Sequence, residues 1–483
     1  MASFEEGEVP PATEEATSVD APVPDSGAYD GGGGGAAALP GLYDDPKDAK
    51  DVNWKDAISV VSEAVASKTP ILDVVISEPQ TTKSMMKSFV TYQVFTKPLG
   101  HVVRRRYSDF QWLRSALYER YTGMLIPPLP PREDTAASTN QDSKFVQRRM
   151  RTLQKFISDV VANPYLRGDE AIISFVSVQQ EKELEKAKAA ASRTNIFNEP
   201  YIGCIAWREY LLNNPAPDNI DRVVLDLRKQ LDFIEKSYNA ALAASRRFSI
   251  KAGEYSREVA MLKDAFKDVL AQETIAADPT KVEANNSYGQ EMVPMVTGLT
   301  ENIDKWSLTT AQRPSIYENV VRPTLEFQLY QITAFRELLD YRELSKKELT
   351  AANKVMLTQK LKREQGKEAA SSMFGKAKDI NEVIREAEED VKGKTLFLSV
   401  LSNALNWSEI FRFNETRLLQ FKQMVTLMST AENTFSSALV EIWRASMETH
   451  GAEVEAALAE IKFLVPEFES GTAGGAVDDV ESV

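Results

Sequence analysis

The chain has 483 residues, a mass of 53.9 kDa and a formal net charge of −14, and this length predicts two to four domains of about 100–200 residues. A single cysteine and two histidines exclude a disulfide framework and a cysteine-rich metal site, so we expect no cofactor and no metal. The acidic start argues against a secretory signal or presequence, and no run reaches the roughly 18 apolar residues of a membrane span. We therefore expect a soluble intracellular protein that would work at membranes only from their surface.

The negative charge is concentrated at the two ends of the chain. Residues 1–56 hold thirteen acidic residues and three lysines, and residues 464–483 hold five acidic residues and no base. Residues 68–178, in contrast, hold sixteen Lys and Arg against ten Asp and Glu. Because charges act over about 8 Å at physiological salt, this basic segment can attract anions whatever the total charge.

The first segment, residues 1–56, has low complexity and includes five consecutive glycines from Gly31 to Gly35. It holds too few aliphatic residues to offset its ordering entropy, so we expect a disordered acidic region. Residues 464–483 form a second acidic segment, the C-terminal tail.

Residues 68–178 predict a three-stranded sheet with helices. Short β-rich runs cover 70–76, closed by Ser77-Glu78-Pro79, then 89–95 and 101–104. Ser108, followed three residues later by Gln111, matches a capping box that opens a helix. After the proline loop Ile126-Pro-Pro-Leu-Pro-Pro131, a second helix carries an apolar stripe, and Asn163-Pro164 ends it. A short third helix carries Phe175.

The linker, residues 179–217, begins with a charged stretch that we expect to be a solvated helix. Residues 194–214 are rich in aromatic and aliphatic side chains. Two interpretations stay open for them: an amphipathic helix that lies in a bilayer interface, or core packing between domains.

Residues 218–450 predict long helices. From Ile220 to Val269, apolar residues follow heptad spacing through about fifty residues, which makes a rod of roughly 75 Å. A second stretch covers 285–367, with Pro314 and Pro323 as expected breaks, and a third covers 379–450. The apolar register of the third stretch slips near Phe411.

The run Arg104-Arg-Arg-Tyr-Ser-Asp-Phe110 is the most informative motif. Three arginines at a strand-to-helix junction are not expected in a core. They form either a solvated strand end or an anion site, in which an arginine fork chelates a phosphate beside the flat ring of Tyr107. Further basic residues follow the proline loop and open the second helix: Arg132, Arg148, Arg149 and Arg151.

These motifs resemble a known family. The segments RRRYSDFQWLRSAL, IPPLPPR and FVQRRMRTLQKFISDVVANP occur in the order typical of phox-homology (PX) domains of sorting nexins, over residues 68–178. The heptad region at 218–450 resembles the BAR domain of PX–BAR sorting nexins. The implied fold is an α+β PX domain followed by an elongated all-α, three-helix coiled-coil BAR domain.

The resemblance also implies a ligand, phosphatidylinositol 3-phosphate, and a role for each residue that matches the family motif. Arg106 would bind the 3-phosphate, and Tyr107 would stack on the inositol. Arg132, where the family usually has lysine, would contact the 1-phosphate, and Arg149 would hold the 4- and 5-hydroxyls. Arg105 and Arg148 would be supporting basic residues, with Arg148 as the alternative to Arg149. Leu125 and Ile126 would belong to a membrane-insertion loop, unless the loop folds onto its own domain.

The resemblance implies a non-enzymatic protein, cytoplasmic and peripheral on early endosome membranes. It would dimerise with itself or with another PX–BAR sorting nexin, sense or shape membrane, and serve cargo sorting, with cargo or a retromer-type coat as further partners and no nucleic acid. The alternative is a structural coiled-coil or adaptor protein that its PX domain merely localises. No P-loop, GxGxxG or HExxH motif supports an enzyme.

Overall fold

The structure is a computed structural model that describes residues 71–83, 88–132, 140, 143–191, 202–277, 287–365, 379–450 and 454–465. All of these residues belong to one compact unit, which spans residues 52–483. The segment 1–56, where we expect disorder, and most of the acidic tail at 464–483 lie outside the described residues.

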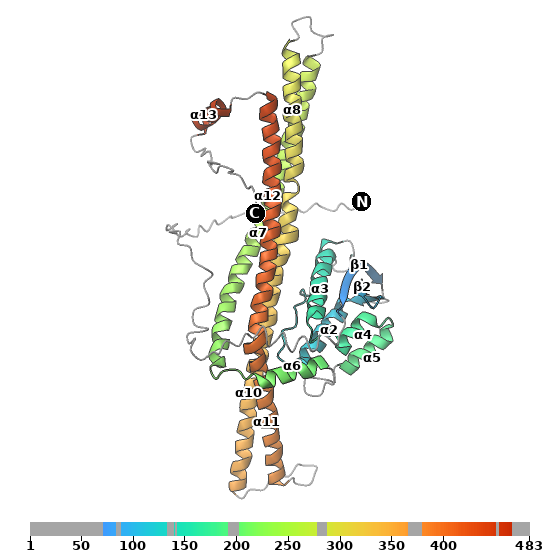
Figure 1. The fold of residues 1–483 in the computed structure, drawn as a ribbon, viewed down its shortest axis with the longest axis vertical. Helices are drawn as coiled ribbons and strands as arrows, with labels where there is room; N and C mark the ends of the chain where they lie inside the picture. Colours follow the sequence, from blue (N-terminus) through green and yellow to red (C-terminus); the bar gives the residue numbers. More distant parts are fainter. Residues whose placement is uncertain are drawn as a thin grey trace, which may run out of the picture. The chain divides into compact units, whose positions relative to one another are not determined.

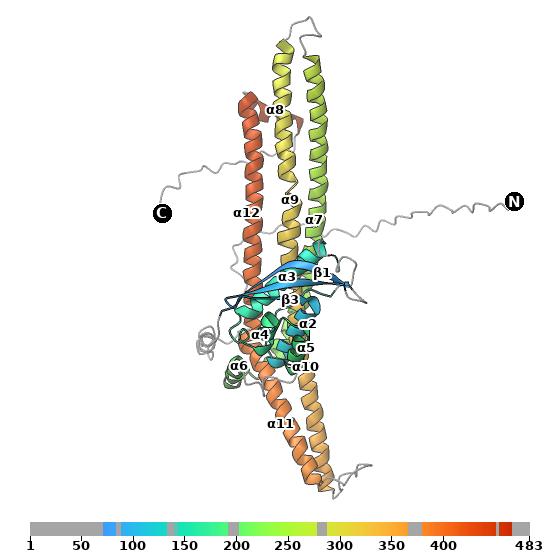
Figure 2. The same ribbon diagram turned by 90° about the vertical axis from the view of Figure 1, so that its right-hand side faces the viewer.

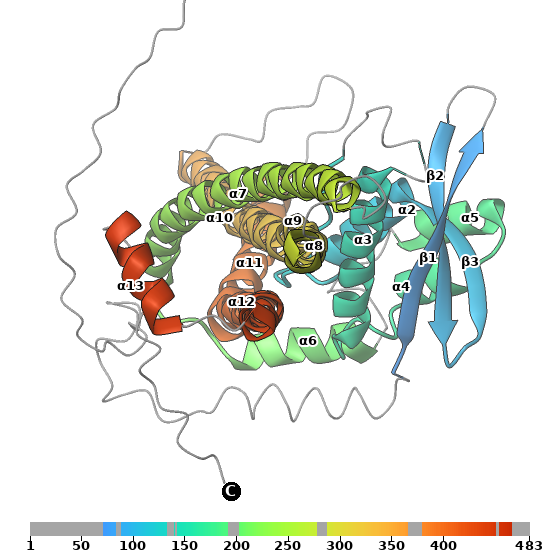
Figure 3. The ribbon, with the colours of Figure 1, turned by 90° about the horizontal axis from the view of Figure 1, so that it is seen from above.

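The N-terminal part of this unit contains one antiparallel sheet in the order β1-β2-β3 (Figure 3). The strands are β1 (Asp73–Lys83), β2 (Ser88–Lys97) and β3 (His101–Arg106). Strand β1 runs past the predicted stop at Ser77-Glu78-Pro79, because the pairing register shifts between Ser77 and Gln80 and the ladder then resumes. Such a bulge accommodates a proline, which has no N–H to donate.

Four helices pack with this sheet: α2 (Tyr107–Arg120), α3 (Lys144–Ala162), α4 (Glu170–Ser177) and α5 (Glu181–Ala191). The predicted helix start at Ser108 is wrong by two residues. Arg106 is the N-cap, and its N–H donates to the Asp109 carboxylate over 2.9 Å, in a capping-box geometry. Asn163 ends α3, as predicted.

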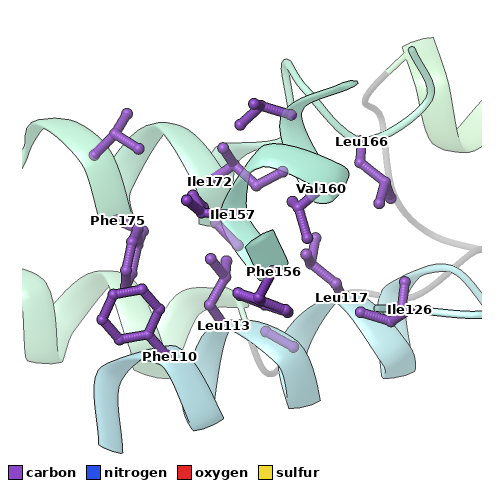
Figure 4. Close-up of a cluster of buried hydrophobic side chains, with 14 of the residues drawn as sticks. Phe110, Leu113, Leu117, Ile126, Phe156, Ile157, Val160, Leu166, Ile172 and Phe175 are labelled. Atoms are coloured by element: carbon purple, nitrogen blue, oxygen red, sulfur yellow. The ribbon is translucent and has the colours of Figure 1, made fainter. Parts of the chain in front are cut away.

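Phe110 of α2 lies at the centre of the first core. Its ring meets Phe175 of α4 edge to face, with centroids 4.9 Å apart, and Phe156 of α3 at 6.4 Å (Figure 4). All three side chains are fully buried. Because α2 packs against both α3 and α4, the residues at the two ends of α2 are also held in place.

The remaining helices are long and match the predicted heptad region (Figures 1 and 2). Helix α7 (Ile220–Ala276) has 57 residues and pairs with α8 (Ser287–Thr310). A second line continues through α9 (Arg313–Ile316), the π-helix η2 (Tyr317–Val321) and α10 (Arg322–Glu364). Pro314 and Pro323 each occupy the first turn of a new helix, as the predicted breaks require.

The third line is α11 (Ile380–Ala404), the π-helix η3 (Leu405–Glu409) and α12 (Ile410–His450), followed by α13 (Val454–Leu464). A π-helical turn adds a residue to the helical repeat, and this explains the register slip predicted near Phe411. Helices α10 and α11 pair with each other, and α12 packs on α8 (Figure 2). The predicted fold class, an α+β domain followed by an elongated helical domain, is confirmed.

Candidate functional site

The three sequence motifs meet at Tyr107. Its ring lies 4.6 Å from the guanidinium carbon of Arg149 on α3, and its hydroxyl donates a hydrogen bond to the Pro130 carbonyl of the proline loop. Burial raises the pKa of the Tyr107 hydroxyl, although the nearby charges of Arg149 and Arg132 oppose the shift. The strand–helix junction, the proline loop and α3 therefore form one local structure.

Arg149 lies between two aromatic rings. Its guanidinium carbon is 4.4 Å from the Phe145 ring and 4.6 Å from the Tyr107 ring, and the residue is 7% exposed. The guanidinium also lies near the Tyr92 hydroxyl, whose pKa burial raises to about 12. A planar cation held between rings keeps its charge and a fixed orientation.

Arg132 and Tyr107 line a cavity of about 490 Å³ together with Arg114. Its opposite wall is part of α10, where Thr333 and Glu337 face it. Arg114 donates to the Glu337 carboxylate over 2.6 Å, so this wall is tied to α2. The cavity is thus formed by the sheet-containing domain and the helical domain together.

Arg106 lies at the edge of this arrangement, with 38% of its side chain exposed. Its nearest carboxylates are Asp109 at 3.7 Å and Glu181 at 3.8 Å, both beyond good hydrogen-bond distance. Its guanidinium carbon is 5.7 Å from the Phe89 ring. Arg106 is therefore a solvent-accessible cation whose existing pairs are weak.

Arg105 has a different environment, which does not favour the prediction that it supports an anion site. The residue is 2% exposed, and its guanidinium donates to backbone carbonyls at the end of α4, over 2.8 Å to Phe175 and also to Val178. Burial lowers its pKa to about 10. The expectation that none of the three arginines is in a core fails here, because helix-terminal carbonyls supply the hydrogen bonds that a buried guanidinium needs.

Arg148 also differs from its neighbour Arg149. It donates to the Glu318 carboxylate of η2 over 3.2 Å and so faces the helical domain, whereas Arg149 faces Tyr107. This geometry favours Arg149 over Arg148 as the residue beside the aromatic ring.

The loop at Leu125 and Ile126 does not have the exposure that a membrane-insertion loop requires. Leu125 is 7% exposed and Ile126 is 1% exposed. The Leu125 N–H donates to the fully buried Glu409 carboxylate over 2.7 Å, and its side chain packs with Leu401 and Leu405. In this structure the burial of Leu125 and Ile126 favours a loop that is packed within the protein over a membrane-insertion loop.

Glu409, which holds the loop, was not anticipated as a functional residue. In the sequence it looks like one more acidic residue of a long helix. The π-helix η3 ends at this residue, and Arg412 donates to its carboxylate over 3.1 Å. The register slip near Phe411 was the only sequence signal of something irregular at this place.

The linker helix α6 (Ile202–Asn213) packs between the two domains. Trp207 is 1% exposed and meets the Tyr165 ring at 5.4 Å, and the Leu211 carbonyl accepts from Asn403 of α11 over 2.8 Å. Residues 194–201 lie outside the described residues, and for 202–214 these contacts favour the interpretation as core packing. Most residues of the charged helix before it, α5, are exposed, as predicted, and Lys188 attaches the helix to Asp109 of α2 over 2.8 Å.

In the described part of the chain, no group of three or more His, Cys, Asp or Glu residues could hold a metal ion. A search of the same residues finds no helix with the length and apolar character to cross a membrane.

Comparison with known proteins finds a domain family and several relatives. The PX domain model matches residues 94–179. Sorting nexin 1 of Arabidopsis thaliana is 22% identical over 402 residues, which cover 80% of this chain and 94% of that protein. Sorting nexin MVP1 of Saccharomyces cerevisiae is 36% identical over 100 residues, 21% of this chain and 19% of that protein.

A solved structure extends the similarity to the helical domain. The cryo-EM structure of the SNX-BAR Mvp1 tetramer matches with a TM-score of 0.52 at 17% identity, covering 77% of this chain and 99% of that chain. At this identity the match concerns the fold. The chain therefore contains a PX domain, is similar to a sorting nexin along most of its length and has the fold of an SNX-BAR protein, and these three similarities together support a PX–BAR sorting nexin.

Proposed function

We propose that this sorting nexin binds phosphatidylinositol 3-phosphate through Arg106, Tyr107, Arg132 and Arg149 and works as a dimer in cargo sorting on early endosomes. The proposal includes the domain boundaries 68–178 for the PX domain and 218–450 for the BAR domain. The observation that carries it is the convergence of Tyr107 with Arg149 and Arg132, beside the accessible Arg106.

Each residue has a chemical task in this proposal. Arg106 exchanges its long contacts with Asp109 and Glu181 for short, paired hydrogen bonds to the 3-phosphate. The Tyr107 ring provides an apolar surface for the inositol. Arg132 contacts the 1-phosphate, and Arg149, which the two aromatic rings orient, donates to the 4- and 5-hydroxyls.

The test is sedimentation of the full chain with phosphatidylcholine vesicles, with and without phosphatidylinositol 3-phosphate. Arg106→Ala should weaken binding by about 2–5 kcal/mol, because the variant loses a charge-assisted pair of hydrogen bonds. Arg104→Ala is the matched control. It removes a charge from the same run, but its guanidinium is occupied by Thr91 and the Glu78 carbonyl, so binding should persist.

The assignment of Arg106 is refuted if this variant sediments like the native chain with an unchanged unfolding curve. Equal losses in both variants would point to a diffuse electrostatic attraction in place of a headgroup site.

The dimer in this proposal is supported by apolar residues that one chain leaves exposed. Four members of the predicted heptad on α7 are spaced by seven residues and are 41–48% exposed: Phe248, Tyr255, Leu262 and Val269. Members of the same heptad nearer the start of α7, such as Leu227 and Leu231, are buried within the chain. Exposed apolar rows at heptad spacing are typical of helices that pack against a partner.

Sedimentation equilibrium of the native chain should therefore give twice the 53.9 kDa chain mass. Leu262→Glu and Phe248→Glu should both shift the equilibrium toward monomer, because each places a carboxylate in the seam. Phe248 also contacts Tyr317 within the chain, at 4.3 Å between ring centroids, so Leu262→Glu separates assembly from stability. A native chain that stays monomeric would point to an obligate partner of another sequence and would contradict self-assembly.

A further inference from the structure

A second basic cavity lies between the PX domain and the helical domain. It has a volume of about 290 Å³, and arginines from three elements line it: Arg148 and Arg149 of α3, Arg246 of α7 and Arg322 of α10. Glu326 is its one acidic lining residue among those described. Figure 3 shows α3 beside the long helices that form the other wall.

The arginines of this cavity outnumber the carboxylates that hold them. Arg148 and Arg322 both donate to Oε1 of Glu318, over 3.2 Å and 2.7 Å. Arg322 and Arg246 both donate to Oε1 of Glu326, over 2.8 Å and 3.0 Å. Three guanidiniums thus share two carboxylates, and this network keeps a net positive charge before Arg149 is counted.

The guanidiniums keep donor capacity beyond this network. Each guanidinium has five N–H groups in a planar fork. Arg246 uses one nitrogen, Nη2, in its pair with Glu326, and 48% of its side chain is exposed. Donors of this kind, arranged around a small volume, suit a tetrahedral anion that accepts from several guanidiniums at once.

The size and the walls of the cavity narrow the ligand class. Ligand pockets usually have volumes of about 300–1,000 Å³, so this cavity is at the lower limit and fits a group of few atoms. Pro130, Pro131, Phe145 and Tyr330 form apolar parts of its wall. Such walls reduce the local dielectric and strengthen the attraction between the guanidiniums and an anion.

We propose that this cavity is a second phosphate site that binds a phosphomonoester group. It adjoins the site at Tyr107 and shares Arg149, Pro130 and Pro131 with it. The group can come from a lipid headgroup or from a soluble polyphosphate, since the chemistry of recognition is the same. Arg246 and Arg322 lie outside the PX domain, so the helical domain supplies part of the anion recognition.

The first experiment uses inorganic pyrophosphate as the probe and isothermal titration calorimetry of the full chain in the Arg106→Ala background, which removes the proposed 3-phosphate contact. Arg246→Gln should weaken pyrophosphate binding roughly tenfold, the effect of one charge-assisted hydrogen bond. The matched control is Arg247→Gln, which removes the adjacent exposed charge and lines none of the cavities described above; binding should be unchanged.

Glu326→Gln gives the opposite sign. It removes the carboxylate that competes with the ligand for Arg246 and Arg322, so pyrophosphate should bind about threefold or more tightly. If the ion-pair network only holds the helices together, Arg246→Gln and Glu326→Gln would both lower the melting temperature and neither would change binding. That result would overturn the proposal.

The second experiment separates the two sources of phosphate. Phosphatidylcholine vesicles that carry phosphatidylinositol 4-phosphate are sedimented with the same variants in the same background. Vesicle binding that depends on Arg246 supports a lipid headgroup, and pyrophosphate binding without vesicle binding supports a soluble polyphosphate. No saturable binding of either probe, or equal losses in Arg246→Gln and Arg247→Gln, would refute the second site and leave the Arg106 assignment untouched.

Discussion

The two ends of helix α2 differ in how their polar groups are used. At the N-terminal end, Arg106 is accessible and its carboxylate partners are 3.7 Å and 3.8 Å away. Beyond the C-terminal end, the turn at Gly123 and the N–H of Leu125 contact the helical domain directly. Helix α2 therefore connects two different places. At Arg106 a ligand can replace the carboxylate partners, whereas at the junction with the helical domain the hydrogen-bond partners are fixed.

The difference shows what to expect of substitutions at each end. Short hydrogen bonds and close packing contribute to stability, so changes at the junction should destabilise the fold. Long ion pairs on the surface contribute about 0–1 kcal/mol, so changes at the open end should alter binding and leave stability nearly constant.

The largest effect is expected at Gly123. Its φ of +87° favours glycine, and an added Cβ would lie 2.8 Å from the Ala404 Cβ of α11. Gly123→Ala should lower the free energy of unfolding by about 2–5 kcal/mol, from the backbone strain and the clash together. Urea unfolding measures this.

Gly100 provides the control for Gly123. Its φ is +70°, but no heavy atom lies within 4 Å of the added Cβ, so Gly100→Ala should cost only about 1 kcal/mol. Equal losses of unfolding free energy in the two variants would show that only the backbone conformation constrains Gly123, and that Ala404 can move away from an added Cβ.

A smaller loss is expected for Arg105→Ala, about 2–3 kcal/mol, because the Phe175 and Val178 carbonyls lose their donor in a buried place. Arg106→Ala, one residue on, should change the free energy of unfolding by less than about 0.5 kcal/mol. Thermal or urea unfolding of the two variants compares them directly. Similar losses in both would remove the distinction between the structural and the accessible arginine.

The smallest effect is expected for Glu181→Gln. This change removes the 3.8 Å pair that competes for Arg106, and should strengthen binding to vesicles with phosphatidylinositol 3-phosphate by about 1.5–3-fold. Glu185→Gln is the control on the same helix, because Glu185 pairs with Lys188 instead. A gain of the same size in the control would reflect only the lower negative charge of α5.

Much of the site could be predicted from the sequence because its motifs are local. The resemblance of the motifs at Tyr107, the proline loop and Arg149 to a PX domain implies that these residues share one site, and the structure brings them together. The apolar stripe of α3 and the breaks at Pro314 and Pro323 also follow from local rules.

What the sequence could not show depends on distant partners. In the sequence, Arg105 and Arg106 look alike. They differ in the fold, where the carbonyls at the end of α4, some seventy residues later, accept hydrogen bonds from Arg105. In the sequence, Leu125 looks like a membrane-facing residue. In the fold, its N–H donates to Glu409, which lies 284 residues away along the chain. The sequence misplaces the start of α2 for a local reason. Ser108 and Gln111 match the capping-box pattern, but the residues that form the box are Arg106 and Asp109.

The close approach at Gly123 and Leu125 has a practical consequence for work with fragments. A fragment that ends near residue 190 lacks α6, α11 and η3, so the Leu125 side chain loses Leu401 and Leu405, and Tyr165 loses Trp207. The PX domain alone would then carry an apolar surface patch that the intact chain covers, and such patches promote aggregation. A weak or variable lipid affinity of the isolated domain would therefore reflect self-association as well as its headgroup site, and fragments that keep residues 202–213 and the helical domain are the sounder starting material.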